Sequence, residues 1–159
     1  MIPNAIRIVR GHATLDKLAL EAFDVGADRI LVIRNWKGNP RFLDMYEVVD
    51  PKRFYRICTL ILKGFKLARE CGNPLPSTKP RNLVLKTRVA TSMDIQLEIV
   101  ECLIRGLHAQ VRDDLGPNDV ELCIEEKRGF YEISFSANNQ RVGPVLRVWR
   151  AKLFPIQHS

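Results

Sequence analysis

The residues best suited to chemistry are cations that stand beside an aromatic ring at a turn. The segment Arg34-Asn35-Trp36-Lys37-Gly38-Asn39-Pro40-Arg41 carries three cations and one indole ring, with Gly and Pro as turn signals. Arginine can grip a phosphate through its planar fork and lysine as a point charge, and tryptophan can stack on an unpaired base. We therefore predict RNA contacts from Arg34, Trp36, Lys37 and Arg41. The alternative is a solvated hairpin in which Trp36 packs on its own sheet.

A second basic segment, Arg7-Ile8-Val9-Arg10-Gly11, lies near the start of the sequence. Arg7 and Arg10 flank a strand end and a glycine turn. They can bind phosphate, or they can pair with Asp24 or Asp28, and the sequence does not separate these alternatives. Both arginines remain candidates for RNA contact.

The third basic segment runs from Gly143 to Arg150. Strand alternation places Arg147 and Trp149 on one face, where a cation and an aromatic ring can contact RNA or a protein. The alternative is a terminal strand whose Trp149 closes the core. We predict RNA contacts from Arg147 and Arg150, and we expect Arg150 and Lys152 to be exposed.

The charge distribution agrees with an anionic partner. The chain has 25 Lys and Arg against 18 Asp and Glu, a formal charge of +7. Residues 1–79 contain 14 cations and 8 acids (+6), whereas residues 80–159 contain 11 and 10 (+1). The positive charge therefore belongs mainly to the first half. Charges of one sign gathered in one region attract a polyanion over long range.

Signals for catalysis, metals and membranes are absent from the sequence. We find no phosphate-binding G-x-x-x-x-G-K-[ST] loop, no G-x-G-x-x-G fingerprint and no G-x-S-x-G elbow. The four cysteines, Cys58, Cys71, Cys102 and Cys123, form no C-x-x-C pair, so we expect no zinc site. Buried free thiols are the favoured interpretation, and disulfides stay open. Without a long apolar run or a signal peptide, we expect a cytoplasmic protein. Because the catalytic and phosphate-binding motifs are missing, we also expect that the protein is not an enzyme and has no cofactor.

The elements that position these residues occur in the same order twice. The first unit has a strand at 5–10, a helix capped by Thr14 and stopped by Gly26, a strand at 29–34, a turn at 36–40 and a strand at 42–49. The second has a strand at 82–88, a helix capped by Ser92, a strand at 120–125, a turn at 127–129 and strands at 131–135 and 145–151.

The segment between the units alternates β-branched and aromatic residues from Arg53, which favours a buried strand over a helix. Residues 72–80 contain three prolines and form a linker by composition. The pattern predicts an α/β fold with mixed sheets, a single domain over 1–159 whose similar halves are 1–71 and 81–159.

The sequence also resembles a known family. Arg10-Gly11, the Leu-rich helix, Gly26 to Ile33 and Trp36-Lys37-Gly38-Asn39-Pro40 resemble the Brix domain, especially in its archaeal members. Lys127 to Tyr131, Gly143-Pro144 and Leu146 to Arg150 match its closing pattern, so the resemblance covers nearly the whole chain.

The resemblance implies a non-catalytic ribosome biogenesis factor that binds ribosomal RNA, or its precursor, during subunit assembly and rRNA processing. It implies two halves that each resemble the anticodon-binding domain of class II aminoacyl-tRNA synthetases, with ribosomal proteins or other assembly factors as further partners. The alternative is a protein-interaction scaffold without direct RNA contact, whose acidic strand around Glu121 to Glu126 meets a basic ribosomal protein.

One departure from the family is at the start. Brix domains normally begin with an additional strand and helix, whereas here Met1 lies just before the predicted strand at 5–10. We expect this to leave an unpaired strand edge in the first half, and an unpaired edge favours association with another chain. The sequence therefore predicts a weak homodimer.

Overall fold

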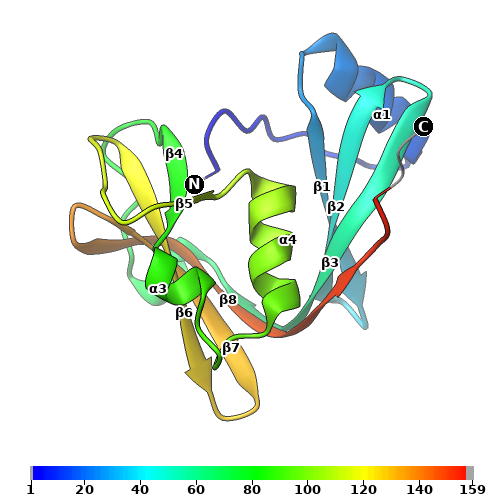
Figure 1. Ribbon diagram of the computed structural model, residues 1–159. Helices are drawn as coiled ribbons and strands as arrows, with labels where there is room; N and C mark the ends of the chain where they lie inside the picture. Colours follow the sequence, from blue (N-terminus) through cyan, green and yellow to red (C-terminus); the bar gives the residue numbers. More distant parts are fainter. Residues whose placement is uncertain (1, 157–159) are drawn as a thin grey trace.

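The computed structural model of the protein describes residues 2–156. Within this range the strands form one eight-stranded sheet of order β1-β2-β3-β8-β7-β6-β4-β5 (Figure 1). Strand pairing is antiparallel except around β4, which is parallel to β5 and β6, so the predicted mixed α/β fold is confirmed. The elements in chain order are α1 (Leu15–Asp24), β1 (Arg29–Trp36), β2 (Asn39–Asp50), β3 (Arg53–Lys66), α2 (Ala68–Cys71), β4 (Asn82–Leu85), α3 (Thr87–Ala90), α4 (Leu97–Leu107), β5 (Gln110–Val111), β6 (Asp119–Lys127), β7 (Phe130–Ala137) and β8 (Gln140–Leu153).

The two parts of the chain share this sheet because β3 pairs with β8. The order helix, strand, strand, strand occurs as α1-β1-β2-β3 and again as α4-β6-β7-β8, with β5 between α4 and β6. The two three-stranded meanders meet at β3 and β8 in the middle of the sheet. Residues 72–80 are irregular but held to the second part, since Gly143 N–H donates to the Pro74 carbonyl at 2.9 Å.

The main core lies between α4 and the middle of the sheet. Ile99, Cys102 and Leu103 of α4 pack with Leu60 of β3 and Val148 of β8, and all five are fully buried. Figure 1 shows α4 between the two wings of the curved sheet, with α1 beside β1 and β2. Leu43 and Met45 of β2 also face α4.

Helix α1 covers a different part of the sheet. Its buried residues, Leu18, Ala19 and Ala22, lie outside the α4 core, and the helix packs on β1 and β2. Val32 and Val48, which alternate with the α4-facing residues of these strands, are buried as well. We call the side of the sheet away from α4 the outer face, and α1 covers it at one end.

Several local predictions are confirmed by backbone geometry. Thr14 caps α1, because its hydroxyl accepts from the Lys17 amide at 3.3 Å. Gly26 follows the helix with φ +73°, the left-handed conformation that suits glycine. The segment from Arg53 is a strand, as its alternation indicates, and it ends at Lys66 before α2.

Other local predictions are wrong. Residues 5–10 are irregular and exposed rather than a strand, because within the described residues neither edge of the sheet pairs with them. Ser92 does not cap α4, which begins at Leu97; its hydroxyl accepts from the Asp94 amide at 3.2 Å and so closes a local turn instead. Strand β4 ends at Leu85, where the sequence predicted a strand to Arg88.

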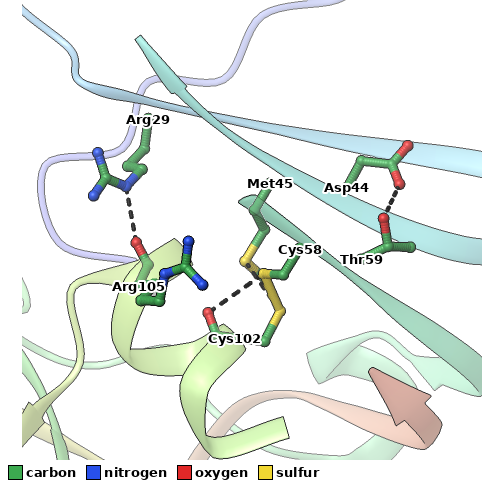
Figure 2. The surroundings of a disulfide bond; sticks show 7 residues. All are labelled: Arg29, Asp44, Met45, Cys58, Thr59, Cys102 and Arg105. Atoms are coloured by element: carbon green, nitrogen blue, oxygen red, sulfur yellow. Dashed lines mark hydrogen bonds between the residues drawn. A yellow bond between two sulfur atoms is a disulfide. The ribbon is translucent and has the colours of Figure 1, made fainter. Parts of the chain in front are cut away.

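The preference for free thiols is wrong for two of the four cysteines. Cys58 of β3 and Cys102 of α4 form a disulfide in the main core, next to Met45 (Figure 2). The bond links elements that are 44 residues apart and joins the central helix to the central strand. Cys71 and Cys123 are free thiols. The absence of C-x-x-C spacing was therefore no guide to pairing, because the partners are brought together only by the fold.

Candidate nucleic-acid interface

The β1–β2 hairpin presents the first predicted basic segment at its tip. Lys37 and Gly38 form the two-residue turn, with φ of 50° and 81°, a conformation typical of tight hairpins. Trp36 lies beside this turn with 62% of its surface exposed, so it does not pack on its own sheet. Arg41 is half-buried on β2. The hairpin thus offers an exposed indole and an exposed lysine side by side.

Arg34 is held by a carboxylate that the sequence did not single out. Its guanidinium donates to both oxygens of Asp44, at 3.2 Å for the Nη2–Oδ1 pair, and the Asp44 side chain is 1% exposed. Thr59 Oγ1 donates to Asp44 at 2.6 Å and Arg56 lies at 4.0 Å. The hydrogen bond that Arg34 donates to Asp44 raises the pKa of Arg34 above its usual range. Arg34 therefore compensates a buried charge before it can serve any ligand.

The strand register brings Arg34 and Arg150 into one row. Arg34, Phe42, Ile61 and Arg150 lie opposite one another on β1, β2, β3 and β8. Neighbours across a sheet point to the same face, so both arginines lie on the outer face, separated by about 14 Å at the usual strand spacing. The next row on this face ends in Lys152, opposite Thr59.

Cations on the outer face lie against aromatic rings. The Arg34 guanidinium lies 4.4 Å from the Phe42 ring centre, and the Arg150 guanidinium lies 4.5 Å from the Trp149 ring. The Phe154 ring contacts two cations, Arg56 at 4.1 Å and Lys152 at 5.2 Å. The Phe130 ring also contacts two, Lys63 at 5.7 Å and Arg147 at 5.5 Å. Such pairs hold cationic heads over apolar surface while leaving them open to an anion.

Strand β8 bulges at its predicted site residues. Val148 pairs with Leu62 and Arg150 with Ile61, which leaves Trp149 as the extra residue. The predicted alternation of Arg147 with Trp149 is interrupted here, and Trp149 is 46% exposed instead of closing the core. Arg150 and Lys152 are exposed, as predicted.

The carboxylate opposite Arg147 in the strand register pairs with a different arginine. The residue opposite it on β7, Glu132, accepts from Arg141 at 3.1 Å. The Arg147 Nε atom is buried and lacks a hydrogen-bond partner among the described residues. Within residues 2–156, therefore, no carboxylate forms an ion pair with the Arg147 guanidinium.

Arg7 and Arg10 lie apart from the hairpin and β8, in the irregular segment before α1. Arg10 Nε donates to the Ala13 carbonyl at 3.0 Å. Of the two predicted alternative partners, Asp24 and Asp28, the second lies within 3.5 Å of Arg29 and 3.0 Å of His108. The structure thus gathers Arg34, Trp36, Lys37 and Arg41 on one hairpin and Arg147 and Arg150 on a neighbouring strand, with Arg7 and Arg10 separate from both.

Comparison with known proteins shows which family the chain belongs to. No family model matches it. A probable Brix domain-containing ribosomal biogenesis protein of Aeropyrum pernix is 33% identical over 150 residues, covering 92% of this chain and 81% of the relative. The chain belongs to the Brix domain-containing ribosomal biogenesis proteins. A family member from Pyrococcus furiosus is 34% identical over 93% of this chain and 73% of its own.

Solved structures agree with this membership. The crystal structure of the probable ribosomal biogenesis protein from Aeropyrum pernix superposes with a TM-score of 0.82 at 33% identity, over 93% of this chain and 82% of that one. Mil, an archaeal Imp4-like protein, has a TM-score of 0.60 at 14% identity, over 96% of this chain and 85% of that one, which supports the fold alone. The eight-stranded mixed sheet is thus a Brix-family architecture.

We also searched the described residues of this Brix protein for metal-binding groups and reactive thiols. Among residues 2–156, no group of three His, Cys, Asp or Glu side chains could hold a metal ion. Burial raises the pKa of the Cys123 thiol, and the neighbouring Glu121 adds to the shift, so the thiol stays protonated at neutral pH. No helix within the described range is long and apolar enough to cross a membrane.

The acidic strand of this Brix protein is partly compensated from within. Glu121 lies 3.6 Å from Lys86, and Glu125 lies 2.9 Å from Lys127. These two carboxylates of β6 therefore each have a cation of their own chain beside them, which weakens the attraction of the strand for a basic partner.

Proposed function

We propose that this protein is a non-catalytic ribosome biogenesis factor that binds ribosomal RNA, or its precursor, through the outer face and the β1–β2 hairpin, in the cytoplasm. Its relatives are named as ribosomal biogenesis proteins, and the observation that carries the RNA-binding part is the row that joins Arg34 to Arg150 across four strands. Cations spaced along a sheet beside aromatic rings suit a phosphate backbone with unpaired bases.

The mechanism of binding would be electrostatic capture followed by stacking. Phosphates release counterions when cations neutralise them, so affinity falls as salt rises. Arg150 ends the row on β8, and Lys37 lies at the hairpin tip, three residues beyond Arg34; both side chains are exposed. Trp36 beside Lys37 is placed to stack on a base that leaves its helix. The remaining proposed phosphate contacts are Arg7, Arg10, Arg34, Arg41 and Arg147.

A double substitution at the hairpin tests this proposal. We expect Lys37→Ala with Arg41→Ala to weaken binding of an rRNA fragment and to lower the slope of log affinity against log salt by about 1.4, or about 0.7 for each single-strand phosphate that is no longer neutralised. Fluorescence anisotropy over a salt series measures both. Lys17→Ala with Arg88→Ala is the matched control, because it removes the same charge from exposed positions on α1 and α3. Salt-independent binding, or equal losses in the two double variants, would contradict the proposal.

The scaffold alternative predicts a different result. A purified protein that ignores rRNA fragments but retains a basic ribosomal protein would favour it. The internal ion pairs of Glu121 and Glu125 argue against the acidic strand as the docking surface.

We also propose weak self-association through the free edge of β1. Within the described residues β1 pairs only with β2, and Ile33 on this strand is exposed. Sedimentation equilibrium should show a concentration-dependent dimer, and Ile33→Lys should shift it to monomer. If the unsubstituted protein stays monomeric at high concentration, the proposal is wrong. The division into halves 1–71 and 81–159, each similar to the anticodon-binding domain of class II synthetases, is a proposal that the repeated order of elements supports.

A further inference from the structure

The pairing of β3 with β8 is interrupted twice within a few residues. One extra residue, Trp149, lies on β8, and one, Lys63, lies on β3. Bulges redirect side chains and often occur beside binding sites. Here they bring an indole ring and a lysine out of the regular alternation in the middle of the sheet. Gly64, opposite Arg147, has no side chain, and the Arg147 aliphatic stem lies over it.

A shallow hollow opens beside the bulged tryptophan. Its walls carry three aromatic residues, Trp149, Phe130 and Tyr131, together with the polar side chains of Gln96 and Glu126; Lys127 and Gly129 complete the lining. The Arg150 guanidinium contacts the Trp149 ring at 4.5 Å, and Arg150 is not itself part of the lining. The hollow thus has aromatic surface, hydrogen-bonding groups and a cation at its rim.

We propose that this hollow is a subsite for one unpaired nucleotide of RNA, an inference that rests on the RNA-binding function proposed above. The base stacks against Trp149, and the adjoining phosphate is held by Arg150 and by Arg147. Arg147 suits this task because Glu132, its register neighbour, bonds Arg141 instead. A duplex cannot enter, since its bases are already stacked and paired. The subsite therefore selects looped or single-stranded RNA.

The polar groups of the hollow give the subsite a preference among bases. The Glu126 carboxylate only accepts hydrogen bonds, whereas the Gln96 amide both donates and accepts. A base with an exocyclic amino group can donate to Glu126, and uracil has no such group. Uracil offers only its ring N3–H as a donor, whereas cytosine offers a two-hydrogen amino group at the edge of its ring, so we expect cytosine to be preferred over uracil, a pyrimidine of similar size.

The chain has two tryptophans, and this allows the subsite to be observed directly. Trp36→Phe leaves Trp149 as the reporter, and Trp149→Phe leaves Trp36. Each full-length variant is titrated with oligocytidine, oligouridine and an RNA duplex of the same length, while anisotropy of labelled RNA measures binding independently. Trp149→Ala is assayed in parallel, with circular dichroism to verify its fold.

The expected result is quenching of Trp149 by oligocytidine, weaker binding of oligouridine, and little quenching by the duplex. Trp149→Ala should lose about 5- to 150-fold in affinity for oligocytidine, the range for one stacked base, and keep its affinity for the duplex. RNA that binds by anisotropy without changing Trp149 fluorescence, and binds Trp149→Ala equally well, would overturn the subsite, leave the hollow to a protein partner and leave the proposed function intact. Equal affinities for the two pyrimidine oligomers would overturn the base preference. A protein that binds none of the RNAs would overturn both proposals.

Discussion

Reduction of the Cys58–Cys102 disulfide should cost the protein a large part of its stability. The bond closes a loop across 44 residues of sequence, and it joins α4 to β3 in the centre of the core. Restricting an unfolded chain over that separation is worth about 4 kcal/mol on the chain-entropy model. For a chain of this size we expect the midpoint of thermal unfolding to fall by about 8–16 °C.

The comparison is best made on one sequence in two redox states. The disulfide is buried, so the protein is unfolded in denaturant with a reductant and refolded under the same reductant before its unfolding is followed by circular dichroism. Cysteine replacement is a poorer test, because removing sulfur from the core adds a cavity cost to the loss of the bond. A variant that lacks Cys71 and Cys123 serves as the control; it keeps the bond and should respond to reduction as the parent does.

Thiol titration decides whether the reasoning holds. The unreduced, denatured chain should expose two thiols, those of Cys71 and Cys123, and the reduced chain all four. Four reactive thiols before reduction would show that the pair does not form. If two are found but the two redox states unfold at the same temperature, the entropic argument fails instead. That outcome would mean that contacts between α4 and β3 already restrict the denatured chain.

Two further perturbations test the packing and the electrostatics. Gly106→Ala should destabilise the protein by about 1–3 kcal/mol in urea unfolding. A Cβ there would lie 3.2 Å from Met45 Cβ and Cγ and closer still to its sulfur, and Met45 is fully buried. Unchanged stability would show that Met45 can shift. Burial opposes ionisation of Asp119, yet hydrogen bonds from Asn82, Arg112 and the Gly116 amide outweigh it and lower its pKa. The stability that Asp119 contributes is present above its unfolded pKa of about 3.9 and is lost as pH falls through its lower folded pKa. Asp119→Asn should therefore make the free energy of unfolding less dependent on pH in that range. An unaltered pH dependence would contradict the assignment.

The sequence was informative wherever structure is set by neighbours in the chain. Thr14 and Gly26 mark the ends of α1, and the alternation from Arg53 identifies β3. It failed where a segment needs a distant partner. Residues 5–10 have the composition of a strand, but none of the described strands pairs with them, and the two-residue strand β5 is defined by its pairing with β4. Strand bulges are likewise set by pairing, so Trp149 could not be placed by alternation.

The same distinction governs which cations are available for the proposed RNA binding. Arg34 and Lys37 look equivalent in sequence, three residues apart in one basic segment. The register of β1 with β2 places Asp44 beside Arg34, whereas no described ion pair joins Asp44 to Lys37. A buried carboxylate costs several kcal/mol unless a cation compensates it. Removing Arg34 therefore weakens the fold as well as any RNA contact, whereas removing Lys37 changes the contact. A loss of RNA binding in an Arg34 variant is consequently evidence about the fold first, and the hairpin's role in binding is tested cleanly only at its tip.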